Sequence, residues 1–301
     1  MGSTGLAQGS EWFRDRTLVL TTKHRKEQVI APLMESEVGV RVIVPTEFDT
    51  DQFGTFTRDV PRPATQVETA RLKATAALEA LGETLAIASE GFFGPHPAIP
   101  YLPCNRELVV LVDRQHGLEI VGEALSTETN YRHQVITSLD EAIAFAGKVG
   151  FPEHGLVVLP DPAGQPEGAI PADLKHAILK GITTGEALEA AVKMGMERSP
   201  NGKVQIETDM RAMHNPTRMR VIHQATLNLV QKIHRTCPSC GTPGFDITQR
   251  RPGLPCGLCT LPTTLTLAVV YTCQRCNFTQ ASLYPDGIQQ ADPGHCEFCN
   301  P

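Results

Sequence analysis

The stretch TQVETARLKATAALEALGETLAIASEG, Thr65–Gly91, contains a helix pattern followed by a strand pattern. Apolar residues recur every three or four positions over Val67–Leu81, which is typical of one face of an amphipathic helix, and Gly82 ends the pattern. The short apolar run TLAIAS then predicts a strand. The unit has an acidic residue at each end, Glu68 in the first helical turn and Glu90 where the strand runs out.

The same two patterns alternate along the chain as far as residue 234. Further strands are expected at residues 16–22, 40–46, 107–114, 118–126, 154–161 and 203–209, and further helices end at residue 35 and cover residues 138–150, 183–199 and 215–234. The Gly- and Pro-rich segments 47–63, 91–103 and 161–172 are expected to be loops. We therefore expect an α/β domain over residues 15–234, a mixed sheet flanked by helices, after a disordered N-terminus at residues 1–14.

The composition of the 301-residue chain excludes several classes of protein. With 41% hydrophobic and 20% charged residues, the chain is typical of a folded soluble protein. No apolar run reaches the roughly 18 residues that a membrane-spanning helix needs, and the first residues lack a signal-peptide pattern. The formal net charge of −6 disfavours nucleic acid and anionic membranes as partners. These features predict a cytoplasmic protein without a membrane partner.

The end of the chain holds four successive Cys-x-x-Cys pairs. They are Cys237/Cys240, Cys256/Cys259, Cys273/Cys276 and Cys296/Cys299. Two such pairs supply the four thiolates of a closed, structural zinc site, and the spacing between pairs is typical of zinc ribbons. We therefore expect two structural Zn²⁺ sites in a small, mostly β domain over residues 235–301. A redox-active pair is the less favoured interpretation.

Spacing alone leaves the partners of each pair open. The simplest arrangement joins the first pair to the second and the third to the fourth, and an interleaved arrangement also fits. Residues 237–301 hold three Arg and no Lys against four Asp/Glu, and a four-thiolate zinc site adds negative charge, so nucleic acid is not expected to bind there. A protein partner, or a cap on the main domain, is the predicted role. Cys104, outside the four pairs, is expected to be a buried apolar side chain.

Three short motifs in a fixed order carry a resemblance to a known superfamily. They are TTKHRK with Thr21, Thr22 and Lys26, ETARLKA with Glu68, Arg71 and Lys73, and ASEG with Glu90 and Gly91. Together they resemble the inosine triphosphate pyrophosphatase and Maf superfamily of nucleoside triphosphate pyrophosphatases. Two positions depart from that pattern, because Lys23 stands where the family usually has Asn and Glu90 where many members have Asp. The resemblance implies a pyrophosphatase-like fold and possible homodimers.

The resemblance also implies roles for individual residues. Glu68 and Glu90 would be catalytic and hold Mg²⁺, while the basic residues neutralise a triphosphate. The expected substrate-binding residues are Thr21, Thr22, Lys23, Lys26, Arg71, Lys73, Arg211, His214 and Arg218. The last three belong to ETDMRAMHNPTRM, which is similar to a base-contacting stretch of the family.

A plainer interpretation exists for several of these residues. Glu68 is also favoured in a first helical turn by the helix dipole, Arg71 is in position to pair with it, and Glu90 then merely ends a strand. Asn215 followed by Pro216 is a common helix start.

Two functions follow from the sequence. The first is a Mg²⁺-dependent hydrolase that converts a non-standard or modified nucleoside triphosphate to monophosphate and pyrophosphate. The second is a non-catalytic module that senses a nucleotide or another phosphorylated small molecule, or that binds a protein through its zinc ribbons. The whole chain, up to its closing ADPGHCEFCNP, is also similar to a family of uncharacterised bacterial proteins, a domain of unknown function.

Overall fold

Strands and helices alternate through a computed structural model of the chain, which describes residues 9–46, 48, 64–161 and 177–301. The strands are β1 (Thr17–Thr21), β2 (Arg41–Ile43), β3 (Leu85–Pro95), β4 (Pro103–Asp113), β5 (Leu118–Ser126), β6 (His133–Ile136), β7 (Leu156–Pro160), β8 (Leu179–Ile182), β9 (Val204–Thr208), β10 (Asp246–Pro252), β11 (Thr266–Thr272) and β12 (Thr279–Leu283). The helices are α1 (Glu27–Leu33), α2 (Gln66–Leu81), α3 (Leu139–Val149), α4 (Gly185–Arg198) and α5 (Pro216–His234). Short helical turns lie at Ser10–Trp12, Met34–Val38, Ala212–His214 and Pro293–His295.

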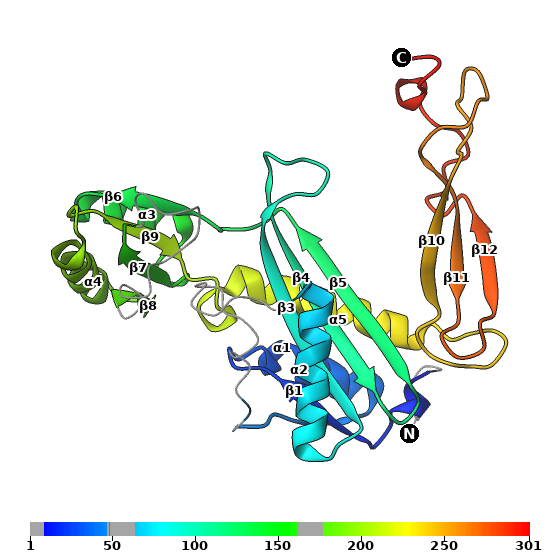
Figure 1. Cartoon of the computed structure of the whole chain (residues 1–301), viewed down its shortest axis with the longest axis horizontal. Helices are drawn as coiled ribbons and strands as arrows, with labels where there is room; N and C mark the ends of the chain where they lie inside the picture. Colours follow the sequence, from blue (N-terminus) through cyan, green and yellow to red (C-terminus); the bar gives the residue numbers. More distant parts are fainter. Residues whose placement is uncertain (1–8, 47, 49–63, 162–176) are drawn as a thin grey trace, which may run out of the picture.

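The largest sheet has the order β2-β1-β3-β4-β5. β1 runs parallel to both β2 and β3, whereas β4 and β5 continue the sheet as antiparallel strands. α2 packs on one face through small residues such as Ala70, Ala74 and Ala77. α1 and α5 cover the other face, where Ile222 and Leu229 of α5 join the largest apolar core. Figure 1 shows α2 and α5 on either side of this sheet.

The local sequence explains where α2 begins and ends. Thr65 is its N-cap, and Thr65 and Glu68 form a reciprocal capping box. Gly82 closes the helix in the left-handed conformation, with φ of 66°, which glycine adopts at little cost. The helix predicted for this stretch is confirmed.

One expected loop is shorter than predicted, because strands include its first five residues and its last one. Residues 91–103 were predicted to be a loop from their Gly and Pro content, but β3 extends to Pro95 and β4 begins at Pro103. Pairing continues without a break from Leu85↔Asp113 to Pro95↔Pro103. The hydrogen bonds to β4 outweigh the low strand propensity of this segment.

A second sheet with its own core lies within residues 130–210. Its order is β6-β9-β7-β8, and every pairing in it is antiparallel. α3 and α4 pack against it through residues such as Phe145, Leu188 and Val192. A third sheet, β10-β11-β12, forms the ribbon that carries the cysteine pairs. In Figure 1 the second sheet and the ribbon extend from different sides of the five-stranded sheet.

The mixed α/β class expected from the sequence is confirmed, with a small β ribbon after it. At the N-terminus, residues 9–14 fold against the core, in contrast to the expected disorder, because Phe13 is fully buried. Residues 1–8, and most of the loops expected at 47–63 and 161–172, lie outside the described residues. Among the helices that the structure describes, none has both the length and the apolar composition needed to cross a membrane.

Gly122 provides a test of how closely α5 approaches the sheet. A Cβ at this position of β5 would lie 2.5 Å from Leu229 Cβ and 2.6 Å from Leu229 N. We expect Gly122→Ala to lower the free energy of unfolding by about 1–3 kcal/mol, because helix backbone cannot move aside cheaply. Urea denaturation measures the change.

Gly147→Ala is the matched control. Gly147 lies in α3, and a Cβ there meets nothing within 4 Å among the described residues. Alanine should raise the free energy of unfolding by about 0.5–1 kcal/mol, because glycine is disfavoured inside a helix. Equal effects of the two substitutions would contradict the close packing of α5 on β5.

Candidate functional site

The candidate site lies where β1 stops and its neighbour β3 continues. β1 ends at Thr21, which pairs with Ala88, while β3 runs on to Pro95. From β1 the chain passes to β2 on one side of it and later returns to β3 on the other side. Open α/β sheets bind ligands at such a switch point, outside the carboxyl ends of the parallel strands.

Lys26, in the loop after β1, is buried at this point. Its Nζ donates a hydrogen bond to Ser89 Oγ at 2.9 Å. Burial is the main cause that lowers the pKa of Lys26 to about 7, and repulsion from Arg218 lowers it further, while Glu107 and Glu90 partly offset both. Lys26 therefore changes charge near neutral pH.

Lys73 and Glu90 form a second charged contact beside Lys26. The Lys73 ammonium, on α2, contacts Glu90 Oε1 on β3. The Lys73 and Glu90 side chains are only 10% and 5% exposed. Gln66, the first residue of α2, donates from Nε2 to the carbonyl oxygen of Glu90 at 3.0 Å. The start of the helix is thereby attached to the strand that carries the carboxylate.

Arg218 and Glu107 form a fully buried ion pair on the α5 face of the sheet. Both side chains are 0% exposed, and Arg218 Nε donates to Glu107 Oε1 at 2.8 Å. Gly91 must be glycine for a steric reason, since a Cβ there would lie 2.5 Å from Glu107 Oε1 and 2.6 Å from an Arg218 nitrogen. The Arg218 guanidinium also lies over the ring of Phe93, 5.4 Å from its centroid.

These five side chains form one group, here called the strand-end cluster: Lys26, Lys73, Glu90, Glu107 and Arg218. When all are ionised, the three cations exceed the two carboxylates by one positive charge. Buried charge is stable only when it is balanced. An anion such as a phosphate group beside these cations would raise the pKa of Lys26 again.

Other predicted residues have different partners in the structure. Thr21 Oγ1 donates to the Ile87 carbonyl oxygen at 3.0 Å. Thr22 Oγ1 is buried and makes no hydrogen bond within the described part of the chain. Lys23 is exposed. Arg71 pairs with Glu119 on β5, with Nε–Oε2 at 2.5 Å.

Glu68 is exposed, and its carboxylate is held by Thr65. Oε2 accepts hydrogen bonds from Thr65 Oγ1 at 2.7 Å and from Thr65 N at 3.1 Å. These two bonds lower the pKa of Glu68, so it is ionised at neutral pH. The structure thus shows Glu68 in a helix-capping interaction.

Arg211 and His214 belong to a separate group around Asp209. Arg211 holds the buried Asp209 with a nitrogen to Oδ2 at 2.7 Å, and Gly181 N donates to the same oxygen at 3.0 Å. Burial lowers the pKa of His214, so the imidazole is neutral at pH 7. Asn215 caps α5 as expected, with Oδ1 accepting from Arg218 N at 2.9 Å. Of the three residues predicted in this stretch, only Arg218 belongs to the strand-end cluster.

Ser89, Glu107 and Asp209 were not among the site residues predicted from the sequence. Glu107 begins the apolar run ELVVLVD, and Asp209 follows the alternating run VQIET. A charged residue that continues a buried strand pattern is a signal for a buried ion pair. Ser89 carried no signal of its own in the sequence.

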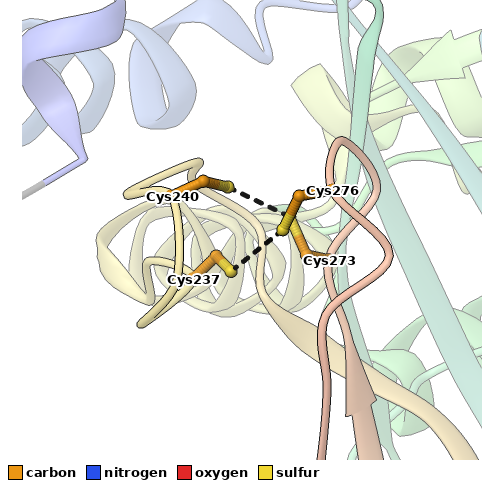
Figure 2. A group of neighbouring side chains, drawn as sticks. All are labelled: Cys237, Cys240, Cys273 and Cys276. Carbon is orange, nitrogen blue, oxygen red and sulfur yellow. Dashed lines mark hydrogen bonds between the residues drawn. The ribbon is translucent and has the colours of Figure 1, made fainter.

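The eight paired cysteines form two clusters of four. Figure 2 shows one of them, here called the proximal site: Cys237, Cys240, Cys273 and Cys276. The distal site contains Cys256, Cys259, Cys296 and Cys299. Sγ–Sγ distances across the proximal site are 3.6 and 3.7 Å, and across the distal site 3.6 and 3.8 Å. Four sulfurs at about 2.3 Å from one zinc ion are about 3.8 Å apart, so both clusters fit structural zinc.

The simplest expectation, that neighbouring cysteine pairs share a zinc ion, is wrong. The first pair joins the third and the second joins the fourth, so the interleaved arrangement is present. The register of the hairpin explains this, because Asp246 at the start of β10 pairs with Thr272 at the end of β11. The first two pairs lie beyond opposite ends of β10, a strand about 20 Å long, and cannot share an ion.

The proximal site attaches the ribbon to the main sheet. Gln274, between the two cysteines of the third pair, accepts from Glu119 N at 3.1 Å and donates to Glu119 O at 2.6 Å. Arg275 lies over the ring of Trp12, 5.3 Å from its centroid. Within the described part of the chain no such anchor holds the distal site, where the middle residues Leu258 and Phe298 are 73% and 72% exposed.

Paired substitutions distinguish the two zinc arrangements. We expect Cys237→Ser/Cys273→Ser to lose one zinc per chain, because both residues belong to the proximal site, and Cys237→Ser/Cys256→Ser to lose both. Zinc released from the purified variants by a thiol reagent measures the number bound. A sequential arrangement would give the opposite result, with both ions lost from the first variant and one from the second.

Comparison with known proteins places the chain in a family. No match was found among curated proteins. A family model described as a domain of unknown function (DUF6671) matches residues 73–301, more than half of the chain. The match starts at Lys73 and takes in Glu90, Glu107, Arg218 and all eight zinc-site cysteines. The chain therefore belongs to the DUF6671 family.

Proposed function

We propose that the protein is a nucleotide hydrolase that converts a non-standard or modified nucleoside triphosphate to the monophosphate and pyrophosphate. One observation carries the proposal: Lys26, Lys73 and Glu90 come from three separate motifs and converge at the switch point of the sheet. The same three motifs carry the resemblance to the inosine triphosphate pyrophosphatase and Maf superfamily. Its pyrophosphatase-like fold is part of this proposal.

The lysines suit the phosphate end of such a substrate. Lys26 and Lys73 belong to a cluster with one excess positive charge, and their side chains are screened from water. Charge interactions are stronger in such surroundings than at the surface. Lys26 and Lys73 would bind the phosphate oxygens and stabilise the negative charge that develops on the leaving pyrophosphate.

Glu90 is the carboxylate best placed to act on the attacking water. It is 4% exposed and beside both lysines. Binding of a phosphate to Lys73 would release the carboxylate from its contact with that ammonium. Glu90 would then orient a water molecule and accept its proton, a contribution of about 10²–10⁴ in rate for a positioned base.

Mg²⁺ is the proposed cofactor, and the donors present fit it in part. Mg²⁺ prefers oxygen ligands and is often held by one or two carboxylates, with water and substrate phosphates completing the shell. Glu90 and the ionised Glu68 would supply the protein ligands, since Glu68 lies on the helical turn that Gln66 attaches to Glu90. When bound, the ion would neutralise phosphate charge and polarise the reacting phosphoryl group.

A non-catalytic binding protein is the second candidate. The contact of Lys73 with Glu90 and the capping role of Glu68 occupy both proposed catalytic carboxylates with structural partners. The exposed Leu258 and Phe298 on the distal zinc site would suit a protein contact. In this alternative a nucleotide binds at the strand-end cluster and the ribbon transmits its presence to a protein partner.

Pyrophosphate release separates the two candidates. With Mg²⁺ and a panel of natural and deaminated nucleoside triphosphates, we expect turnover of one or a few substrates. Glu68→Gln and Glu90→Gln should each lower kcat by about 10²-fold or more, because each removes a negative charge from the proposed metal site. Glutamine at position 68 can still complete the capping box, so the fold should be retained.

Glu79→Gln is the control for this experiment. Glu79 lies on the same helix and pairs with the exposed Arg114. Its substitution should leave kcat unchanged. Nucleotide binding without turnover, with affinity unchanged in Glu68→Gln, would instead identify the binding protein. Neither binding nor turnover by a zinc-loaded, folded protein would refute both candidates.

The pKa of Lys26 predicts how binding depends on pH. Because the pKa is about 7, Lys26 is mostly charged at pH 6 and mostly neutral above pH 8. The affinity for a substrate analogue with an α,β-methylene bridge should therefore fall up to roughly tenfold per pH unit above pH 7. Lys26→Arg, which stays charged, should bind with much less dependence on pH. Calorimetric titrations at pH 6–8.5 measure both, and equal slopes would contradict a role for Lys26 in binding phosphate.

A further inference from the structure

Asn105 on β4 has a buried side-chain oxygen that has no hydrogen-bond partner among the residues that the structure describes. The residue is 2% exposed, and its Oδ1 accepts no hydrogen bond from any residue that the structure describes. Almost all buried polar side-chain atoms in folded proteins are hydrogen-bonded, because an unpaired one lowers stability. When a chain retains such an atom although it lowers stability, the usual explanation is a functional site.

The register of the sheet places Asn105 next to the strand-end cluster. Asn105 is opposite Phe93 on β3, and the next pair on the same face of the sheet is Gly91 opposite Glu107. This is the face covered by α5, since Glu107 is bound there by Arg218. The amide therefore lies beside the Arg218–Glu107 ion pair.

Phe93 adds a half-buried aromatic ring at the same level of the sheet. The Arg218 guanidinium is 5.4 Å from its centroid, and the ring of Tyr131 is 5.8 Å away. An aromatic ring beside a carboxamide can recognise a planar heterocycle in two ways. The ring provides stacking or edge contacts, and the amide hydrogen-bonds to the edge of the heterocycle.

Thr22 Oγ1 and Asn105 Oδ1, the buried side-chain atoms that lack a partner within the described ranges, lie toward opposite ends of this stretch of β3. Thr22 follows the last residue of β1, near the Lys26–Ser89 contact, and Asn105 pairs with Phe93. Ser89 and Phe93 are four residues apart, roughly 13 Å along a strand. This length suits a nucleotide with its phosphates near Lys26 and its base near Phe93.

We infer that Asn105 is a specificity-determining residue that binds the base of the nucleotide, an inference that rests on the proposed function. Its Oδ1 would accept from an N–H of the base, and its Nδ2 would donate to a neighbouring ring nitrogen or carbonyl oxygen. The ligand class is therefore a nucleotide whose base carries an N–H donor next to an acceptor.

Asn105→Leu tests this inference by affinity and by stability. The probes are nucleoside monophosphates and inorganic pyrophosphate, measured by calorimetry without turnover. We expect the variant to bind the preferred monophosphate at least tenfold more weakly and to bind pyrophosphate with unchanged affinity. Its melting temperature should equal or exceed that of the unmodified protein, because leucine has the same branched side chain of four heavy atoms and leaves no unpaired amide oxygen.

Asn228→Leu is the matched control, since Asn228 on α5 has a partnered amide that accepts from Glu123 N at 3.1 Å. This variant should melt at a lower temperature and bind the monophosphate normally.

Two results would overturn the inference and leave the proposed function intact: unchanged monophosphate affinity in Asn105→Leu, or a loss of stability as large as in Asn228→Leu. The unmodified protein could also bind pyrophosphate and bind no monophosphate of the panel more tightly than pyrophosphate. That result would support the phosphate site and refute the base site. If the protein binds none of the probes, the proposed function and the inference both fail.

Discussion

The ion pair between Glu107 and Arg218 connects the parts of this protein. Both side chains are fully buried, so each charge depends on the other for its stability, and removal of either partner is expected to cost about 3–5 kcal/mol. The pair fixes the start of α5 against the middle of β4. The second sheet joins α5 at this end, and the zinc ribbon follows its other end. The position of one guanidinium thus constrains three parts of the chain.

The strand-end cluster depends on the unequal lengths of β1 and β3. Because β1 stops at Thr21, the part of β3 beyond Ala88 has no β1 residue beside it. Lys26 can therefore approach this edge of β3 and contact Ser89. Lys73 approaches the same strand from the α2 face and Arg218 from the α5 face. Three cations from three elements meet around Ser89–Gly91. Gly91 permits this approach because it has no side chain.

Local patterns predicted the helices and strands well, and long-range geometry limited the rest. Thr65 and Gly82 mark the ends of α2 through capping interactions that depend only on neighbouring residues, so the sequence alone was sufficient. The end of β3 could not be read this way, because pairing with β4 decides whether Phe92–Pro95 are extended. The cysteine spacing indicated zinc but not which pairs share an ion, since the register of β10 and β11 determines that. The motifs indicated Lys26, Lys73 and Glu90 as a group, but their partners Glu107 and Ser89 appear only when the strands are side by side.

The interleaved zinc sites have a consequence for biosynthesis. A nascent chain that has just passed Cys259 can bind zinc tightly only through its first two cysteine pairs, the arrangement that the folded protein does not use. Domains begin to fold while synthesis continues, so zinc captured this early has non-native ligands. The proximal site needs Cys273 and Cys276, and the distal site needs Cys296 and Cys299. Either zinc is acquired late, once β10 and β11 have paired, or it must exchange thiolates as the hairpin forms.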